Sequence, residues 1–493
     1  MSHVAGAMTN DPLDGLLPLP QLVERRPGTI TLTARTRIVL VADEHAPDAH
    51  LHEHVVTHLV GDVHRASGLH LSRADTPVAG DVVLQLDGNV RQHGAEGYAL
   101  DIDEQGARLR AATAHGLWNG SRTLVQLFAH DPADTSLPCV HIVDHPRFEW
   151  RGAMLDVARH FFGVDHVLRF VELIARFKLN RLHLHLTDDQ GWRIDIDGWP
   201  ALTGIGGASA VGGGTGGWFS REDYREIIAH AARHFVTVVP EVDMPGHTNA
   251  ALASVPALNP DGVCPPRYTG RGVGFSSLRL TAPATRRFVA DVIAQLAADT
   301  PGEFLHIGGD EAHVTEPGEY RQFVELLQQE LTRHGKRMVG WEEIATTPLA
   351  PGAVVQHWLQ PPVAALAPTG TRFLMSPAAH TYLDMRHAAD DRIGRRWAGM
   401  IDVDTAYGWD PAAQLDGVGD DRIVGVEAPL WTEKVPTFAD VEELCFPRLA
   451  CIGEVGWTPQ ARRTWDGFRP RAAVHAERLR AIGVQVYRSA LLV

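Results

Sequence analysis

The stretch of sequence that decides the fold runs from residue 152 to residue 186. It begins with Gly152-Ala-Met-Leu-Asp-Val157 and ends with Arg181-Leu-His-Leu-His-Leu186, and both runs have the length and apolar character of buried strands. Between them, apolar side chains recur at the i, i+3, i+4, i+7 spacing of a helix: Val167, Phe170, Val171 and Ile174. This order predicts two parallel strands joined by a crossover helix.

The same alternation of strand and helix continues toward the C-terminus. Eight short apolar runs are candidate strands: Gly152–Val157, Arg181–Leu186, Val236–Val242, Phe304–Ile307, Arg337–Gly340, Ala353–His357, Thr371–Met375 and Ile423–Glu427. Between them, Ser220 and Asp223 form a capping box, and a further apolar stripe runs from Phe288 to Leu296. Because eight parallel strands close a TIM barrel, we predict an α/β chain whose residues 147–493 form a catalytic (β/α)8 TIM barrel.

The residues before the barrel have a different pattern. We assign residues 1–19 to an N-terminal tail and residues 20–145 to a small α+β accessory domain. Its predicted elements are strands at Thr29–Ala34, Arg37–Val41 and Val82–Leu86, a hairpin of Tyr98–Ile102 with Ala107–Ala111, and then one helix at Gly116–Phe128.

Composition excludes several classes of function. The chain has 493 residues and a formal net charge of −15, which argues against nucleic acid or an anionic membrane as a partner. No apolar run reaches the roughly 18 residues of a membrane span, and the first ten residues lack a secretory signal, so we expect a cytoplasmic protein. Four cysteines without a CxxC pair predict neither a disulfide framework nor a metal site. The sequence does not indicate an oligomeric state.

Acidic and tryptophan side chains gather where the predicted strands end. Chemistry in this type of barrel sits on the loops after the strands. The strand ends here carry Asp156, Arg159, Asp188, Asp189, Glu241, Asp243, His247, Asp310, Glu311, Trp341, Glu342, Trp358, Tyr382, Asp384, Glu427, Trp431 and Glu433. Any one of these acids could simply cap the N-terminus of a helix. Helix capping does not explain why acids and tryptophans occur together at so many strand ends. Sugar rings present apolar C–H faces, which pack on tryptophan, and hydroxyls, which hydrogen-bond to carboxylates. The combination therefore predicts a carbohydrate site.

Asp310 and Glu311 form the most suggestive pair. They follow a short strand and two glycines, Gly308 and Gly309, which allow a tight turn and close backbone approach to a ligand. Two carboxyls held close together disfavour double ionisation, so we expect the pKa of one of them to be raised toward the range of a general acid.

Six ordered motifs resemble those of glycoside hydrolase family 20, the β-N-acetylhexosaminidases. They are Gly152-Ala-Met-Leu-Asp-Val-Ala-Arg-His-Phe161, His183-Leu-His-Leu-Thr-Asp-Asp-Gln-Gly-Trp192, Pro240-Glu-Val-Asp-Met-Pro-Gly-His247, His306-Ile-Gly-Gly-Asp-Glu-Ala-His313, Gly340-Trp-Glu-Glu343 and Trp431-Thr-Glu433. The segment from Glu96 to Leu127 also resembles the end of that family's accessory domain. The resemblance covers nearly the whole chain.

The resemblance implies a retaining, exo-acting enzyme that removes terminal β-linked N-acetylglucosamine or N-acetylgalactosamine from small glycosides or oligosaccharides, without a cofactor or metal. In this family the substrate's own 2-acetamido oxygen is the nucleophile, through an oxazolinium intermediate. By resemblance, Glu311 is the general acid and then the base. Asp310 orients the acetamido N–H and stabilises the intermediate, and Tyr382 hydrogen-bonds the acetamido oxygen. The pocket walls would be Trp341, Trp358 and Trp431.

The resemblance also assigns the remaining site residues. Arg159 would bind the 3- and 4-hydroxyls, and Glu433 and Asp384 would accept from the 4- and 6-hydroxyls. Asp188 with His247 would adjust the acid from behind, and Trp397 would flank the leaving group.

Three alternatives remain open from the sequence. His183 and His185 point the same way on one strand, as the ligands of a metal-dependent amidohydrolase would, although their place inside a strand favours the barrel interior. A second alternative is a non-catalytic sugar-binding protein, which would be expected to have lost Asp310 or Glu311. The third is a retaining glycosidase with an enzyme nucleophile about 5 Å from Glu311.

Overall fold

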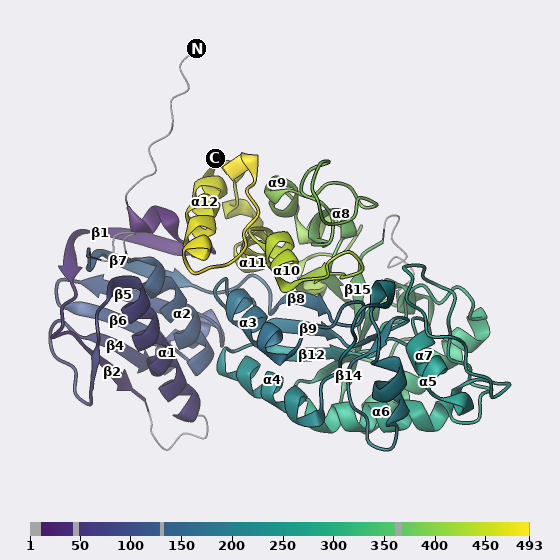
Figure 1. Cartoon of the computed structure of the whole chain (residues 1–493). Helices are drawn as coiled ribbons and strands as arrows, with labels where there is room; N and C mark the ends of the chain where they lie inside the picture. The colour runs from purple at the N-terminus through teal and green to yellow at the C-terminus, as the bar shows by residue number, and fades with distance from the viewer. Residues whose placement is uncertain (1–10, 43–48, 129–132, 360–366, 493) are drawn as a thin grey trace, which may run out of the picture.

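The computed structural model describes residues 11–42, 49–128, 133–359 and 367–492. The chain forms an N-terminal domain built on a seven-stranded sheet, followed by a closed eight-stranded barrel (Figure 1). Within the described residues, no helix is both long enough and apolar enough to cross a membrane.

The barrel closes in the order β12-β13-β14-β15-β16-β17-β8-β9, with every neighbouring pair parallel. Its strands are β8 (Trp150–Asp156), β9 (Arg181–His185), β12 (Thr237–Glu241), β13 (Phe304–His306), β14 (Arg337–Trp341), β15 (Val354–His357), β16 (Arg372–Met375) and β17 (Ile423–Leu430). All eight predicted strands are present, with ends that differ by at most three residues. The prediction of a TIM barrel with a small N-terminal domain is confirmed.

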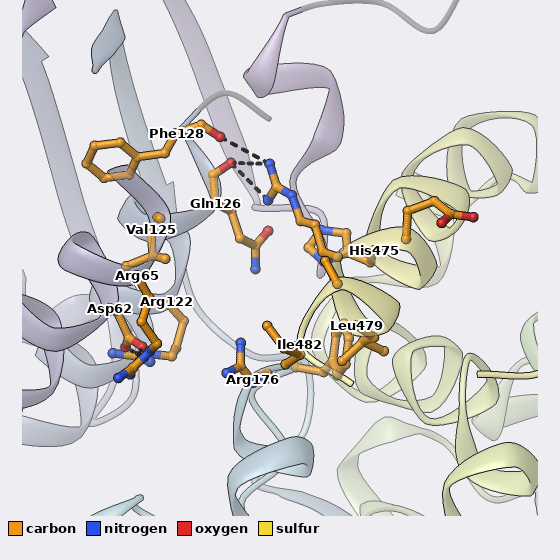
Figure 2. A pocket seen from close by; sticks show the side chains of 15 residues that line it. Asp62, Arg65, Arg122, Val125, Gln126, Phe128, Arg176, His475, Leu479 and Ile482 are labelled. Atoms are coloured by element: carbon orange, nitrogen blue, oxygen red, sulfur yellow. Dashed lines mark hydrogen bonds and ion pairs between the residues drawn. The ribbon is translucent and has the colours of Figure 1, made fainter. Parts of the chain in front are cut away.

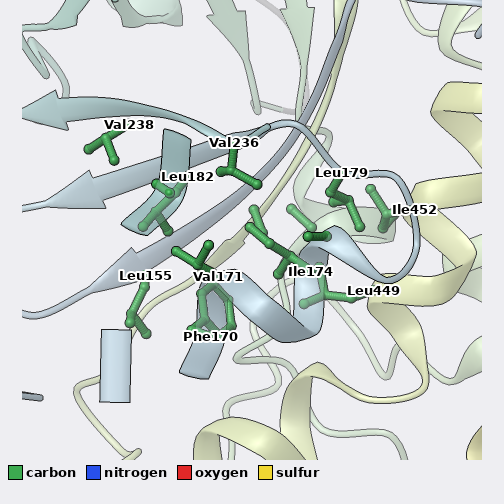
Figure 3. Close-up of a cluster of buried hydrophobic side chains, with 14 of the residues drawn as sticks. Leu155, Phe170, Val171, Ile174, Leu179, Leu182, Val236, Val238, Leu449 and Ile452 are labelled. Carbon is green, nitrogen blue, oxygen red and sulfur yellow. The ribbon is translucent and has the colours of Figure 1, made fainter. Parts of the chain in front are cut away.

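Helices surround the barrel and bury its outer surface. They include α3 (Val164–Ala175), α4 (Arg221–Arg233), α6 (Thr285–Asp299), α7 (Pro317–Arg333), α11 (Arg448–Trp457) and α12 (Trp465–Ala481). The predicted stripe of α3 packs inward: Phe170, Val171 and Ile174 lie against strand residues such as Leu155 and Leu182, beside Leu449 and Ile452 of α11 (Figure 3). Ser220 and Asp223 form the predicted capping box at the start of α4.

The barrel interior has an apolar layer and a polar layer. The apolar layer consists of Trp150, Val239, Phe304, Val339, Val354, Leu374 and Val424. Toward the carboxyl ends of the strands, Glu241 contacts His183 at 2.8 Å and His306 at 3.0 Å, and it also contacts His185. Both ring nitrogens of His183 and of His185 contact carboxylates. The predicted position of this histidine pair inside the barrel is therefore confirmed.

The N-terminal domain contains more structure than the sequence predicted. Its sheet has the order β1-β7-β5-β6-β4-β2-β3, formed by β1 (Leu22–Thr31), β2 (Arg37–Val41), β3 (Ser72–Ala74), β4 (Val82–Leu86), β5 (Tyr98–Asp103), β6 (Gly106–Ala111) and β7 (Ser136–Asp144). The predicted hairpin is β5 with β6, and the predicted helix is α2 (Ala114–Gln126). The expectation of a single helix was wrong, because α1 (Ala49–Ser67) packs beside α2.

Local sequence signals explain the errors in this domain. The first strand begins at Leu22 rather than Thr29, because Pro27-Gly28 resembles a turn but forms an irregularity inside the strand, where Gly28 has φ 97°. The strand β7 escaped prediction because it contains Pro138. Residues 11–19, assigned to the tail, contain a short 3₁₀ helix at Pro12–Gly15 and bury Leu16 and Leu17. All four cysteines are free.

Lys178 joins the two domains through a buried ion pair. Its ammonium, in the turn after α3, lies 2.9 Å from the Asp144 carboxylate of β7 and 3.0 Å from the Tyr98 hydroxyl. Asp144 also accepts a hydrogen bond from Trp457. All of these side chains are buried, so Lys178 compensates a charge that water cannot reach.

We expect Lys178→Met to lower the free energy of unfolding by about 3 kcal/mol, since it leaves Asp144 buried without its cation. Denaturant unfolding of the variant measures this loss. The double variant Lys178→Met, Asp144→Asn removes both charges and should recover part of the stability. A single variant as stable as the parent would contradict the role of this ion pair.

Candidate active site

A cavity of about 330 Å³ opens at the carboxyl ends of the barrel strands. Ten of the twelve predicted site residues line it: Arg159, His247, Asp310, Glu311, Trp358, Tyr382, Asp384, Trp397, Trp431 and Glu433. They come from the loops after six different strands. The other two, Asp188 and Trp341, are buried and lie directly behind residues of the cavity wall.

The backbone around the acid pair is strained. Gly308 and Gly309 have φ of 66° and 94°, and Glu311 has φ of 43°, a conformation that a residue with a Cβ rarely adopts. A Cβ on Gly308 would come within 1.8 Å of an Asp243 carboxylate oxygen, and the Gly309 N–H donates to the same oxygen at 2.9 Å. The close approach predicted for these glycines is therefore made to Asp243, and the turn presents Asp310 and Glu311 to the cavity.

His247 connects the acid pair to a buried ion pair. Its Nε2 lies 3.6 Å from Asp310 and 3.4 Å from Glu311, while its Nδ1 lies 3.2 Å from Asp188. Burial alone would lower the pKa of His247, but Asp188 and Asp310 raise that pKa well above its usual value. Burial likewise opposes ionisation of Asp188, but Arg159 and His247 hold the pKa of Asp188 well below its usual range.

The charge on His247 also bears on metal binding. Donor atoms of His247, Asp310 and Glu311 lie within 4.8 Å of one another, which is spacing that a cation could use. A histidine that is protonated at neutral pH has no lone pair to offer a metal. The described residues therefore favour an ion-pair network at this position.

The raised pKa that the sequence predicted for one member of the acid pair belongs to Asp310. Burial and neighbouring Asp243 raise the pKa of Asp310 well above its usual value, whereas the resemblance implies that Glu311 is the proton donor. Burial also raises the pKa of Asp243 to about 7, with Glu241 adding to the effect against the opposing charge of His247. The raised pKa thus falls on the more deeply buried member of the pair, because desolvation acts on Asp310 most strongly.

Aromatic side chains form one wall of the cavity. The Tyr382 ring stacks parallel to Trp358 with ring centroids 6.2 Å apart, and Trp431 lies 6.4 Å from Tyr382. Trp397 is 52% exposed and stands edge-on to Tyr382. Trp341 is only 1% exposed, with its ring 5.5 Å from Trp431 and its indole N–H donating to Glu241.

Polar side chains also line the cavity. The Arg159 guanidinium lies 2.7 Å from Asp188 and 5.0 Å from the centre of the Trp431 ring. Both carboxylate oxygens of Asp384 and one of Glu433 are buried without a hydrogen bond from the described residues. Burial and nearby Glu433 raise the pKa of Asp384 well above its usual value. Buried polar atoms normally have partners, so these oxygens favour a ligand that carries hydroxyls.

Sequence reasoning missed several residues around the site. Glu343 accepts from the Trp358 indole N–H at 3.1 Å and from the Glu311 backbone N–H at 3.4 Å. Burial and the charge of Asp310 raise the pKa of Glu343 to about 8. Glu343 is the last residue of the Gly340-Trp-Glu-Glu343 motif, and that motif was the signal that could have identified it. Arg271 and Arg395, which also line the cavity, come from long loops that carry no motif.

A larger cavity of about 530 Å³ lies between the N-terminal domain and the barrel. Figure 2 shows Asp62, Arg65 and Arg122 on one side, with Leu479 of α12 and Ile482, which follows that helix, on another. It shares no lining residue with the active-site cavity and contains no adjacent pair of acids. The adjacent acids Asp310 and Glu311 line the cavity at the barrel mouth instead.

Comparison with known protein families agrees with this geometry. The model of the glycosyl hydrolase family 20 catalytic domain matches residues 148–322 and 313–460, and the model of domain 2 of the same family matches residues 14–145. This chain belongs to glycosyl hydrolase family 20. The resemblance predicted from six motifs is confirmed.

Relatives of this family 20 enzyme include a Beta-N-acetylhexosaminidase from Cellulomonas fimi, which is 40% identical over 94% of this chain and 93% of its own length. A GH20 beta-N-acetylhexosaminidase from Streptomyces coelicolor A3(2) superposes with a TM-score of 0.91 at 41% identity, covering 97% of this chain and 98% of the other. A mutant Streptomyces plicatus beta-hexosaminidase in complex with product (GlcNAc) is 42% identical, with a TM-score of 0.91 over 98% of both chains. The chain is a glycoside hydrolase of the β-N-acetylhexosaminidase class, as predicted.

Proposed function

We propose that this enzyme removes a terminal β-linked N-acetylglucosamine or N-acetylgalactosamine with retention of configuration, using the substrate's own acetamido oxygen as the nucleophile. The relatives' names support the substrate class, since they are hexosaminidases and one is solved with GlcNAc. The observation that carries the mechanism is the position of Asp310 beside an aromatic wall. Tyr382 and Asp310 lie close enough to interact electrostatically, and Trp358 and Trp431 flank Tyr382.

This arrangement matches the parts of an acetamido group. The aromatic faces suit its methyl, the Asp310 carboxylate can accept its N–H, and the Tyr382 hydroxyl can donate to its oxygen. A plain hydroxyl at the same sugar position would not fill the apolar part of the pocket. Holding the acetamido oxygen below the anomeric carbon replaces an enzyme nucleophile with one that is already in place.

The proposed reaction has two steps. Glu311 donates its proton to the glycosidic oxygen while the acetamido oxygen bonds to the anomeric carbon, which releases the leaving group and forms an oxazolinium ion. Asp310 stabilises the positive charge of this ion. Glu311, now a carboxylate, takes a proton from water as that water attacks the anomeric carbon, so the acetamido group is restored and the original configuration returns.

The polar lining of the cavity supports an exo mode of action. Arg159 would bind the 3- and 4-hydroxyls, while Asp384 and Glu433 would accept from the 4- and 6-hydroxyls. A hydroxyl that these side chains hold cannot at the same time carry a further sugar. N-acetylglucosamine and N-acetylgalactosamine differ in the orientation of the 4-hydroxyl. Arg159 and Glu433 can bind a 4-hydroxyl in either orientation, so we propose both sugars as substrates.

A thiazoline analogue of the oxazolinium ion tests the proposed mechanism. It should inhibit competitively and bind at least 100-fold more tightly than substrate, because a site of this kind favours the geometry of the transition state. The inhibition constant against a nitrophenyl N-acetylglucosaminide measures this preference. An enzyme that cleaves that substrate but is not inhibited by the thiazoline would supply its own nucleophile instead.

The charge on His247 leads to a prediction about pH. Asp310 acts as a carboxylate; burial raises its pKa, and the positive charge of His247 opposes that rise. His247→Asn removes the opposing charge, so the pKa of Asp310 should rise further, and the acidic limb of the kcat profile should move to higher pH by about one to three units. His230→Gln, on α4, is the control and should leave the limb in place. An unchanged limb in His247→Asn would contradict the coupling.

A further inference from the structure

Two histidines and a glutamate gather on the outside of the barrel, away from the active site. Glu172 lies on α3, while His230 lies in the last turn of α4 and His234 caps the end of that helix. One possible ligand atom from each of the three side chains lies within 4.8 Å of the other two. His234 comes just before β12, and Glu241 is at the other end of that strand. The cluster is therefore at the opposite end of the barrel from the acid pair.

The distance between His230 and Glu172 suits a metal ion better than a hydrogen bond. The His230 Nε2 lies 3.5 Å from the Glu172 carboxylate, and this buried nitrogen has no hydrogen-bond partner among the described residues. Two ligands of a tetrahedral zinc ion, each about 2.0–2.1 Å from the metal, are about 3.3 Å from each other. A zinc ion can therefore join these two groups with little movement of either side chain.

His234 and Glu172 are in the protonation states that metal ligands require. The His234 Nδ1 donates to the main-chain oxygen of His230 at 2.9 Å, and burial lowers the pKa of His234 to about 4. The ring is thus neutral at neutral pH, and its Nε2 keeps a lone pair. Histidines that bind metals commonly donate their other ring N–H to a carbonyl in this way. Neighbouring His230 lowers the pKa of the Glu172 carboxyl, so Glu172 is ionised.

Two arginines near the cluster limit its affinity for a cation. The exposed Arg233 side chain donates to the His230 Nδ1 at 3.5 Å, and Arg176 is close enough to act on the charge of Glu172. A His230 that binds metal through Nε2 carries its proton on Nδ1, so Arg233 must turn toward solvent. We therefore expect micromolar rather than nanomolar affinity.

The cluster also contacts the N-terminal domain, whose helices lie beside this end of the barrel (Figure 1). The His234 ring centroid lies 4.8 Å from that of His58 on α1 and 5.7 Å from that of Trp118 on α2. Burial lowers the pKa of His58 to about 4, so this neighbour adds no positive charge at neutral pH. An ion that fixes the His234 ring also fixes a surface on which α1 and α2 pack.

We propose that Glu172, His230 and His234 bind one zinc ion, with water completing its coordination, and that this ion stabilises the contact between the barrel and the N-terminal domain. Two imidazoles with one carboxylate favour a transition metal over calcium or magnesium, which prefer oxygen ligands. The end of a TIM barrel opposite the active site contributes to stability rather than to chemistry. The zinc site is therefore independent of the proposed hydrolysis.

A titration with zinc chloride tests the site. The full chain, without a histidine tag and freed of metal by dialysis against a chelator, competes for zinc with a chromogenic indicator. We expect one zinc ion per chain with a micromolar Kd. Glu172→Gln and His230→Gln should each weaken binding by at least about tenfold, since even the loss of a residue that only supports a ligand has this effect.

Two features keep the variants interpretable. Glu172 is exposed, so its replacement by glutamine should not disturb folding. His64→Gln is the matched control, because His64 and His70 form another pair of neighbouring histidines, with ring centroids 3.8 Å apart, on the exposed surface of the N-terminal domain. The control should keep the zinc affinity of the parent.

Thermal unfolding tests the stabilising role. Zinc at about a hundredfold excess over Kd should raise the Tm of the parent and of His64→Gln by roughly 3–5 °C, because the ion binds the folded state. The shift should be largely lost in Glu172→Gln and His230→Gln. Bound zinc that leaves the Tm of the parent unchanged would overturn the stabilising role.

The titration can also contradict the site itself. A parent chain that binds no zinc at micromolar concentrations would overturn the proposal. Equal affinity in the parent and in both ligand variants would overturn it as well, since the ion would then be bound elsewhere. If zinc also inhibited hydrolysis in that case, the active-site carboxylates Asp310 and Glu311 would be its ligands instead.

Discussion

Glu311→Gln should lower kcat/KM by roughly 10²–10⁴-fold on substrates with poor leaving groups, because the amide cannot donate the proton that the departing oxygen needs. Glu311 is held toward the cavity by a left-handed backbone and lies 3.4 Å from His247. The amide has the same shape as the acid, so the fold should be retained. A nitrophenolate leaves without a proton, so the loss should be much smaller on nitrophenyl substrates.

Steady-state kinetics on a disaccharide and on a nitrophenyl glycoside measure this difference. Glu316→Gln, at an exposed position five residues away, is the matched control and should keep normal activity on both substrates. Thermal unfolding of the two variants checks that the fold is retained. Normal turnover of the disaccharide by Glu311→Gln would remove Glu311 from the role of proton donor.

Asp310→Asn should lower kcat by roughly 10²–10³-fold, the range observed when one group that stabilises developing charge is removed. The carboxylate accepts the acetamido N–H and balances the charge of the oxazolinium ion, and the neutral amide can do only part of this. Because the charge develops during the reaction, the effect should fall on kcat more than on KM.

Single-turnover and steady-state kinetics with an N-acetylglucosaminide separate these two parameters. Asp416→Asn, an exposed substitution outside the site, serves as the control. Equal kcat values for Asp310→Asn and the parent would show that Asp310 does not act on the intermediate.

Much of the fold was predictable because each barrel strand is short, apolar and followed by an amphipathic helix or a loop. The first unit, from Gly152 to Leu186, already contains this pattern, and β8, α3 and β9 form where it predicted. The N-terminal domain was harder to predict. In α1 the apolar stripe of Val55, Val56, Leu59 and Val63 is interleaved with histidines, which weakens the helical signal. In β7, Pro138 argued against a strand, and the strand is recognisable only from its pairing with β1 and β5.

The site was predictable at the level of which residues meet, because parallel strands bring their following loops to one face. The pKa shifts and the contacts between residues of different loops were not predictable from the sequence. That the raised pKa falls on Asp310, that Glu343 supports Trp358, and that Arg395 pairs with Glu433 all depend on packing between distant loops. No spacing within one motif contains that information. The positions of Asp188 and Trp341 behind the cavity wall follow from the same three-dimensional packing.

Nitrophenol release from three glycosides tests most directly whether the substrate supplies the nucleophile. The β-N-acetylglucosaminide, the β-N-acetylgalactosaminide and the plain β-glucoside are compared with one purified sample. We expect the two acetamido sugars to be hydrolysed and the glucoside to remain intact, because it has no acetamido oxygen to attack the anomeric carbon. Hydrolysis of the glucoside at a similar rate would contradict the claim and assign the nucleophile to the enzyme.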